Sequence, residues 1–349
     1  MSTKIAIVGS GFGMYCLLPA FRTFKECQVV GICGKNSERM RNYCEKLDVK
    51  RYTDWKEMLQ IEKPDAVAIA VIPKHQFEIA KYALENKIAV FAEKPLTTDT
   101  KSSLELNELA KKNKLANMID FEFTEIPEWI EAKKEIENGL IGKIIHVNVD
   151  WTFLSYDLRN HIKSWKTDVE QGGGALSLVF SHTFYYLENI LGRIKDIECK
   201  FTSSEKSLNN GDTTIDMKIS FENGCTGNAH LDIADTKQHN HSLIFEGDQG
   251  TMILKNSSKD LVDNFELAVN NKETQKIKKT NSKIWKEKKI IINNELQDPR
   301  VKAIVPIAER FIKWCNSGVA AKPDFQDGLR VQELIELARI SNSRLNMNK

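Results

Sequence analysis

Residues 4–13 read Lys-Ile-Ala-Ile-Val-Gly-Ser-Gly-Phe-Gly, and this stretch decides the fold of the first part of the chain. Its apolar half is short and nearly continuous, as in strands that are buried on both faces of a parallel sheet. A helix is predicted from about residue 14 to residue 24, and a second strand at residues 28–33. A glycine turn in this setting lets a pyrophosphate approach the amino terminus of the helix. We therefore predict contacts with a dinucleotide cofactor from Gly9, Ser10, Gly11, Phe12 and Gly13.

The alternation of strands and helices continues to about residue 122. Apolar runs at residues 66–71, 88–91 and 116–121 predict three more strands, accompanied by helices at residues 52–61, 77–85 and 101–112. Apolar strands that alternate with helices are typical of a parallel sheet with helices on both faces. The sequence thus predicts an α/β Rossmann domain over residues 1–122. Ligands bind such sheets beyond the carboxyl ends of the strands.

The residues that follow the second strand bear on the choice of cofactor. An acidic residue there would hydrogen-bond the ribose hydroxyls of NAD and repel the phosphate of NADP, but residues 34–37 are Gly-Lys-Asn-Ser. Basic and hydroxyl side chains can gather a phosphate, although solvated charges are equally ordinary at such a place. We expect NADP(H), with NAD as the alternative, bound with the help of Gly34, Lys35, Ser37 and Arg39.

Residues 91–95 read Phe-Ala-Glu-Lys-Pro and follow an apolar strand. Lys94 therefore lies beyond the carboxyl end of a strand, where a partly desolvated ammonium can hold a substrate hydroxyl. A solvated lysine before a turn proline is the alternative. We predict that Lys94 is catalytic. To the cofactor side of this edge we assign Val71, Pro73, His75, Glu93 and Lys94, and a surface histidine at a helix terminus is the alternative for His75.

In the second part of the chain, most predicted strands follow one another directly instead of alternating with helices. Strands are predicted at residues 144–153, 197–203, 213–221, 225–232, 241–246 and 251–254, joined by turns such as Glu222-Asn223-Gly224. Turns of this kind connect antiparallel strands. Helices are predicted at residues 127–137, 306–316 and 328–344, and the lysine-rich segment 272–289 is expected to be a solvated hairpin or loop. We predict a second domain of α+β class over residues 123–349, which serves substrate binding and oligomerisation.

A helix predicted at residues 175–191 carries the second catalytic candidate. It follows three glycines at 172–174, and its apolar stripe leaves His182 on another face, free to project into a cleft. A neutral imidazole is a natural proton acceptor near neutral pH, whereas a structural histidine is the alternative. The substrate side is assigned to Glu122, Trp165, Lys166 and Tyr185, each with ordinary packing or solvation as the alternative. No metal site is expected, because the sequence indicates no third metal ligand to join His239 and His241.

Four ordered motifs together resemble the glucose-fructose oxidoreductase, inositol dehydrogenase and MocA (Gfo/Idh/MocA) family. They are the glycine turn at 9–13, the run 65–75 that ends in Pro-Lys-His, Glu93-Lys94-Pro95, and the segment 172–182 that ends in Ser-His. The resemblance covers nearly the whole chain. It implies a Rossmann domain followed by a domain with a large, mostly antiparallel open sheet, a cis peptide before Pro95, and a terminal helix that packs back on the first domain. It also implies homo-oligomers, here a dimer or tetramer.

The resemblance implies a metal-independent oxidoreductase that acts on CH-OH groups of sugars, polyols or nucleotide sugars with NAD or NADP. Lys94 and His182 would then form the acid-base pair. The family often has an aspartate four residues before the histidine, where this chain has Leu178, so the usual trio is reduced to two. The alternative is a non-catalytic sensor of NAD(P) that binds a protein partner through its open sheet.

Composition narrows the remaining classes of function. A formal net charge of +2 gives no pull towards nucleic acid or membranes, and no apolar run approaches membrane length. The seven cysteines are scattered and odd in number, which is typical of reduced thiols. We therefore expect a cytoplasmic protein with a small-molecule substrate.

Overall fold

The computed structural model describes residues 2–235, 238–271, 275, 276 and 298–347 of the 349-residue chain. The chain forms two compact units. Unit 1 comprises Met1–Glu122 with Lys289–Gln332, and unit 2 comprises Phe123–Lys288 with Glu333–Lys349. Sequence reasoning assigned all of residues 123–349 to the second domain, whereas unit 1 takes up a carboxyl-terminal segment.

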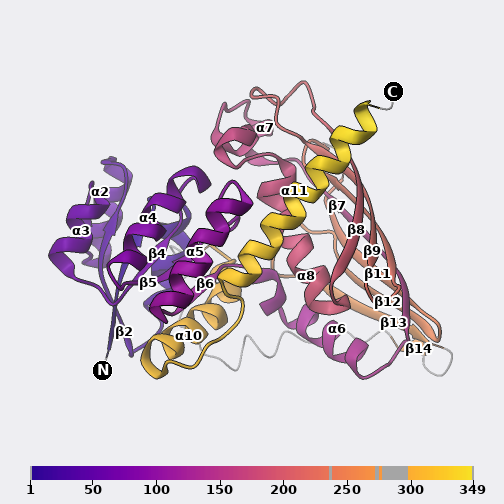
Figure 1. Cartoon of the computed structure of the whole chain (residues 1–349), viewed down its shortest axis with the longest axis horizontal. Coiled ribbons are helices and arrows are strands. Elements are labelled where there is room, and N and C mark those ends of the chain that lie inside the picture. The colour runs from indigo at the N-terminus through magenta and orange to yellow at the C-terminus, as the bar shows by residue number, and fades with distance from the viewer. Residues whose placement is uncertain (1, 236–237, 272–274, 277–297, 348–349) are drawn as a thin grey trace. The chain divides into compact units, whose positions relative to one another are not determined.

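Unit 1 is built on a six-stranded parallel sheet with the strand order β3-β2-β1-β4-β5-β6. Strands β2, β4, β5 and β6 of this sheet are labelled in Figure 1. Its strands are β1 (Thr3–Val8), β2 (Cys27–Cys33), β3 (Arg51–Tyr52), β4 (Ala66–Ile69), β5 (Ala89–Ala92) and β6 (Asn117–Ile119). Its helices are η1 (Gly13–Leu17), α1 (Leu18–Phe21), α2 (Glu38–Leu47), α3 (Trp55–Glu62), α4 (Pro73–Glu85), α5 (Thr100–Asn113) and α10 (Val301–Ser317). The order reverses between β1 and β4, so their carboxyl ends are the expected position of a ligand.

The core of unit 1 joins the sheet to the late helix α10. Phe21, Phe91 and Phe311 pack edge to face, with ring centroids 5.3, 5.7 and 6.3 Å apart. Helix α10 also buries Ile304 and Ile307 completely in the same cluster. Because each fully buried apolar side chain contributes about 1.5–3 kcal/mol, α10 is an integral part of this unit.

Unit 2 is built on an eight-stranded sheet with the order β14-β13-β12-β11-β7-β10-β9-β8. Only the pair of β7 and β10 is parallel among these described strands, and the other neighbours are antiparallel. The strands are β7 (Ile144–Thr152), β8 (Ile194–Thr202), β9 (Thr214–Phe221), β10 (Thr226–Asp232), β11 (Asn240–Gly247), β12 (Gly250–Asn256), β13 (Glu266–Asn271) and β14 (Gln275–Lys276). The helices are η2 (Glu122–Glu125), α6 (Pro127–Glu137), α7 (Tyr156–Arg159), η3 (Trp165–Thr167), η4 (Val169–Gln171), η5 (Leu176–Phe180), α8 (Ser181–Leu191) and α11 (Phe325–Met347), which begins in unit 1.

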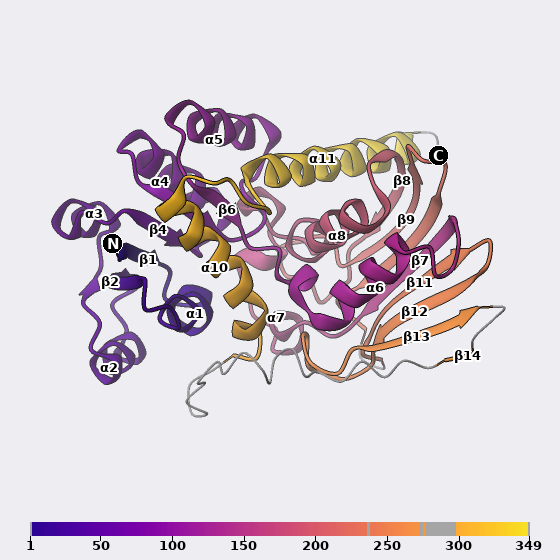
Figure 2. The ribbon, with the colours of Figure 1, turned by 90° about the horizontal axis from the view of Figure 1, so that it is seen from below.

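The two faces of this sheet differ. Helices α6 and α8 lie along one face (Figure 2). Alternate residues of β7 turn Val147, Val149 and Trp151 into the buried layer, and the intervening Asn148 and Asp150 are only half-buried. Such alternation is what a sheet with one covered face requires. The predicted α/β plus α+β fold, with a parallel sheet and a mostly antiparallel one, is confirmed.

Two side chains near the end of helix α11 accept hydrogen bonds from the backbone of the edge strand β8. The backbone N–H of Cys199 donates to Ser341 Oγ, and that of Phe201 donates to Asn342 Oδ1, both over 2.9 Å. An edge strand exposes unpaired N–H groups, and these two side chains satisfy a pair of them.

Local differences from the sequence-based elements have simple causes. The two helices that follow glycines begin as π-helical turns, η1 and η5, which periodicity cannot distinguish from α-helix. Strand β13 was missed, because its polar residues did not alternate clearly. Most of the lysine-rich segment 272–289 lies outside the described residues. Among the described helices, none is long and apolar enough to cross a membrane.

Candidate active site

The glycine turn after β1 has the backbone that a pyrophosphate requires. Gly9 has a φ of +136°, and a Cβ there would lie 2.2 Å from the carbonyl oxygen of Ala70. A Cβ on Gly11 would meet nothing within 4 Å, so that side of the turn is open for close approach by a ligand. The turn therefore fits a dinucleotide by its local geometry.

A group of basic residues surrounds the tip of β2. Arg39 donates to the Ser10 carbonyl over 3.2 Å, and the Ser37 hydroxyl accepts the Met40 N–H and caps α2. Asn36 Oδ1 accepts hydrogen bonds from both Arg41 and Arg51, over 3.0 and 2.6 Å. Sequence reasoning missed Arg41 and Arg51. Strand β3 carries Arg51 to this place from outside the local motif, whereas Arg41 lies close to Arg39 in sequence.

A buried glutamine of helix α4, Gln76, holds the loop after β5 by hydrogen bonds to its backbone. The side-chain amide of Gln76 contacts the carbonyl oxygens of Pro95 and Leu96, each over 3.1 Å, and that of Glu93. The Lys94-Pro95 peptide is cis, as the resemblance implied. Helix α4 thus fixes the backbone on which Lys94 sits. On the same helix Pro73 is buried and His75 is exposed, while Val71 lies half-buried just before it.

Three carboxyls gather in unit 1 beyond the ends of β5 and β6. Ala92 pairs with Ile119 across these strands, so Glu93 and Asp120 follow side by side. Asp120 is fully buried and Glu122 is 4% exposed. We call Glu93, Asp120 and Glu122 the carboxyl cluster. Asp120 was missed by sequence reasoning, because a carboxylate after a strand looks the same in sequence whether solvated or buried.

Burial favours the protonated forms of the carboxyl cluster. Burial raises the pKa of Glu93, although the charge of Lys94 opposes that rise. Burial, together with the charges of Glu93 and Glu122, raises the pKa of Asp120 well above its ordinary value. Burial also raises the pKa of Glu122 to about 7, which the charge of Glu93 favours and that of Lys94 opposes. Buried carboxyls behave this way because a low dielectric disfavours their charged form.

An arginine before α10 joins this region to the glycine turn. The Arg300 guanidinium makes two hydrogen bonds to Asp298, of 2.8 and 2.6 Å, and lies 4.8 Å from the centre of the Phe12 ring. Burial would raise the pKa of Asp298, but these hydrogen bonds and the charge of Arg300 lower it. The charge of Arg300 also acts on Glu93 and Glu122.

In unit 2, His182 lies in the first turn of α8 and is 5% exposed. Its ring meets Phe123 edge to face, with centroids 4.8 Å apart, and Trp151 lies 6.5 Å away. His241 stacks on Trp151 at 4.0 Å in the same aromatic group. Burial lowers the pKa of His241 to about 3, so this ring is neutral at physiological pH.

The triple glycine before this helix is explained by close packing. A Cβ on Gly173 would lie 2.0 Å from the Trp165 carbonyl oxygen. On Gly174, whose φ is +88°, it would lie 2.3 Å from Asp212 Oδ1. Asp212 instead accepts the Leu176 N–H over 2.7 Å at the start of the helix. Sequence reasoning missed Asp212, which comes from a distant loop.

The other substrate candidates of unit 2 lie in or near the same loops. Lys166 forms an ion pair of 3.2 Å with Asp157, which is 8% exposed at its side chain. Trp165 and Tyr185 are half-buried. These residues belong to unit 2, whereas Lys94 belongs to unit 1. Among the described residues, no three or more His, Cys, Asp or Glu side chains are grouped to hold a metal ion.

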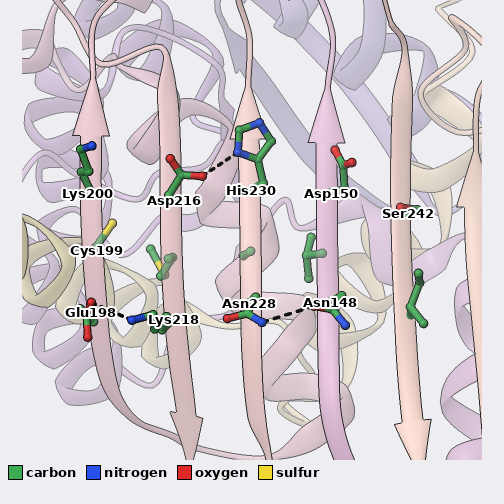
Figure 3. Close-up of a pocket in the computed structure, with 14 residues that line it drawn as sticks. Asn148, Asp150, Glu198, Cys199, Lys200, Asp216, Lys218, Asn228, His230 and Ser242 are labelled. Carbon is green, nitrogen blue, oxygen red and sulfur yellow. Dashed lines mark hydrogen bonds and ion pairs between the residues drawn. The ribbon is translucent and has the colours of Figure 1, made fainter.

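The open face of the eight-stranded sheet carries a groove of about 710 Å³ (Figure 3). Its polar residues form two rows across the strands, which we call the charged rows. One row contains Lys200, Asp216, His230, Asp150 and Ser242, and the other contains Glu198, Lys218, Asn228 and Asn148. His230 bonds Asp216 over 2.8 Å, and Lys218 bonds Glu198 over 3.1 Å.

Comparisons with known proteins agree with this architecture. Residues 3–121 match the family model described as an oxidoreductase family with an NAD-binding Rossmann fold, and residues 133–344 match its C-terminal alpha/beta domain. An uncharacterized oxidoreductase of Synechocystis sp. is 23% identical, with 96% of this chain and 92% of that protein covered. A D-xylose dehydrogenase of Paenarthrobacter nicotinovorans is 23% identical over 48% of this chain and 45% of its own length.

Solved structures share the fold at low identity. A levoglucosan dehydrogenase in complex with NADH superposes with a TM-score of 0.84 at 18% identity, covering 99% of this chain and 98% of that one. KijD10, a 3-ketoreductase from Actinomadura kijaniata in complex with NADP, gives 0.79 at 17% identity, with 98% of each chain covered. With both domain models matched over most of its length, the chain belongs to the Gfo/Idh/MocA family of NAD(P)-dependent oxidoreductases.

Proposed function

We propose that the protein transfers a hydride between NADP(H) and a hydroxyl or keto carbon of a sugar, polyol or nucleotide sugar, without a metal. The observation that carries this proposal is the setting of Lys94. It follows a buried strand of the cofactor-type sheet, on a backbone fixed by Gln76, among carboxyls that respond to its charge. An ammonium so placed can hold a substrate oxygen at the edge where ligands bind.

Lys94 and His182 would divide the work on the substrate. Lys94 donates a hydrogen bond to the substrate oxygen and stabilises the negative charge that develops there. His182 accepts the hydroxyl proton during oxidation and returns it during reduction. The nicotinamide, when bound, supplies the hydride acceptor or donor. Acid-base catalysis of this kind contributes a rate factor of about 10² to 10⁴.

Residues around the pair would orient the substrate. Glu122 follows β6 at the same edge of the sheet as Lys94, and its charge interacts with that of Lys94. In unit 2, Trp165 and Tyr185 offer half-buried aromatic faces, and Lys166 is anchored by Asp157. Aromatic faces with a few polar groups suit a sugar ring. Leu178 leaves His182 without the customary aspartate.

The preference for NADP(H) over NAD rests on the basic group at the tip of β2. Arg41 and Arg51 converge on one oxygen of Asn36, and Arg39 and Lys35 lie next to Ser10. A phosphate attracts such a cluster of guanidinium donors. Lys35→Asp should therefore shift the preference towards NAD, measured as the ratio of kcat/KM for the two cofactors.

The assembly and location of the protein complete the proposal. The open sheet face of unit 2 would form the contact in a homodimer or homotetramer, since closed symmetric assemblies are the commonest. The protein would act in the cytoplasm on a small-molecule substrate. Gfo/Idh/MocA relatives include D-xylose, levoglucosan and inositol dehydrogenases, which favours sugar-like compounds.

The test is reduction or oxidation of the nicotinamide across a panel of sugars, polyols and nucleotide sugars, with NADP and NAD run separately. Lys94→Ala should lower turnover by at least about 10² and leave cofactor affinity nearly unchanged. Lys101→Ala, which removes an exposed lysine of the same unit, serves as the matched control and should keep full activity. Equal turnover in Lys94→Ala would remove Lys94 from the mechanism. Tight NADPH binding with no turnover on any compound would favour the sensor instead.

A further inference from the structure

Two side chains from distant segments bond the start of η5, the turn that leads into the His182 helix α8. Asp212, which precedes β9, accepts the Leu176 N–H at Oδ2 over 2.7 Å. Arg339, in α11, donates from Nη2 to Ser177 Oγ, also over 2.7 Å. We call these two hydrogen bonds the turn contacts. Because Ser177 and Asp212 are only 3% and 8% exposed, little water competes for them.

The backbone just before η5 does not fix the direction of the helix by itself. Gly172 and Gly174 have φ values of +89° and +88°, and glycine has more backbone freedom than any other residue. In addition, η5 is a π-helical turn, a rare geometry that is found mostly as single turns inside α-helices, frequently at functional sites. Contacts from elsewhere in the fold therefore set the direction in which α8 leaves the turn.

A change in η5 would displace His182. A π-helical turn contains one residue more than an α-helical turn, and one residue of an α-helix corresponds to about 1.5 Å of rise and about 100° of rotation. Closure of η5 as an ordinary α-turn would thus move the His182 ring out of its edge-to-face contact with Phe123, whose centroid lies 4.8 Å away. Misplacement of a reacting group by about 1 Å can lower a rate about 10²-fold.

We propose that Asp212 and Arg339 are positioning residues, which hold η5 in its π-helical form and thereby set the direction in which α8 presents His182. Asp212 fixes the backbone of the turn, and Arg339 fixes its side through the Ser177 hydroxyl. Neither side chain takes part in the proton transfer itself. The expected effect on turnover rests on the proposed function, in which the His182 imidazole exchanges the substrate proton.

The first test follows the His182 ring by NMR of protein labelled at histidine, and it needs no turnover. The resonance of this ring is the one that His182→Asn removes. Arg339→Met and Ser177→Ala each remove the same hydrogen bond, so both should shift the resonance as the ring moves relative to Phe123. Arg193→Met, the same substitution at an exposed arginine of unit 2, should leave it in place. An unshifted resonance in folded Arg339→Met and Ser177→Ala would overturn the proposal.

A pair of substitutions at Asp212 tests the other turn contact. Asp212→Ala leaves the Leu176 N–H without its acceptor, whereas Asp212→Asn keeps an oxygen at this place. With the substrate found in the panel, Asp212→Ala should lower kcat at least about tenfold and leave KM for NADPH unchanged, and Asp212→Asn should restore most of kcat. Asp212→Ala should also shift the His182 resonance. A lower melting temperature with kcat and the resonance unchanged would show a merely structural role and overturn the proposal for Asp212.

A double-mutant cycle on kcat tests whether Arg339 acts through Ser177. The double variant Arg339→Met with Ser177→Ala should lower kcat no further than Arg339→Met alone, about tenfold. Additive losses would show that Arg339 acts by another route, and would overturn its role. The proposed function fails separately. Full turnover in His182→Asn would reject His182 as the proton acceptor, while a shifted resonance in Arg339→Met would still support the positioning of its ring.

Discussion

Acidic and basic side chains meet in two regions of this molecule under opposite conditions. In the carboxyl cluster of unit 1, Asp120 and Glu122 are buried and Glu93 is half-buried, and burial raises the pKa of all three acids. In the charged rows of unit 2 they alternate across an open sheet face, where the paired side chains of Lys218 and Glu198 are 71% and 56% exposed. The same residue types therefore tend to retain protons in the carboxyl cluster, whereas in the charged rows they form only weak ion pairs at the surface.

The difference shows that water, more than the number of charges, decides what an ionisable residue does. In the charged rows, solvent screens each pair, so an ion pair contributes about 0–1 kcal/mol. In the carboxyl cluster little water reaches the side chains. A carboxyl there must either keep its proton or have its charge balanced by a hydrogen-bonded partner. Three substitutions test this contrast, in order of decreasing effect on stability.

The largest effect is expected from breaking the Arg300–Asp298 pair of unit 1. Arg300→Met removes the two side-chain hydrogen bonds to Asp298, whose side chain is only 24% exposed. We expect a loss of about 3 kcal/mol in the free energy of unfolding, because the carboxylate keeps the backbone N–H of residue 300 but loses its counter-charge in a mostly buried place. Urea denaturation measures this loss. Lys218→Met in the charged rows is the control. An equal loss in the free energy of unfolding of both variants would show that burial does not distinguish the two regions.

A medium effect is expected in the pH dependence of stability. In the folded protein the pKa of Glu122 is about 7, whereas its ordinary value is 4.5. Between these values the folded state keeps a proton that the unfolded chain has lost. The contribution of Glu122 to stability is therefore fully present below pH 4.5 and is lost as the pH rises towards 7, by about 1.4 kcal/mol per pH unit.

Urea denaturation at several pH values between 5 and 6.5 measures that slope. Glu122→Gln should flatten it by about 1.4 kcal/mol per pH unit, since the amide does not titrate. Glu198→Gln, an exposed glutamate of the charged rows, should keep the wild-type slope. A slope that Glu122→Gln leaves intact would mean that Glu122 does not hold its proton in the folded state.

The smallest effect is expected in the charged rows themselves. Glu198→Gln removes the partner of Lys218 at 3.1 Å, and we expect a loss of less than about 1 kcal/mol in the free energy of unfolding. Because salt screens exposed charges, the loss should shrink further in 1 M salt, where the Debye length is about 3 Å. A loss of several kcal/mol, independent of salt, would show that water is excluded from this face.

Sequence patterns predicted the parts of the fold that depend on local rules. The glycine turn at Gly9–Gly13 and the run before Lys94 carry their signal in neighbouring residues, through periodicity and backbone freedom. The predicted fold class and enzyme family are confirmed. The roles of Lys94 and His182, and of the other site residues, stay predictions.

The missed residues share one cause. Asp120 and Arg51 meet partners on other strands or loops, and Arg300 brings its guanidinium to the distant Phe12 from a returning segment, although it also bonds the nearby Asp298. Nothing local distinguishes a buried Asp120 from a solvated one, because its burial depends on how β5 and β6 pair. Asp212 likewise reaches the Leu176 N–H from a distant loop. Folding creates these environments, and single-sequence patterns do not contain them.

The hydrogen bonds from β8 to Ser341 and Asn342 have a consequence for how the protein stays separate from its own copies. A bare strand edge is a template on which another chain can add a strand, and repeated addition builds fibres. Because the last turns of α11 accept hydrogen bonds from two of these N–H groups, another strand cannot pair with β8 at these positions. Removal of the last nine residues would take away both acceptors and leave these two N–H groups of β8 open to another strand.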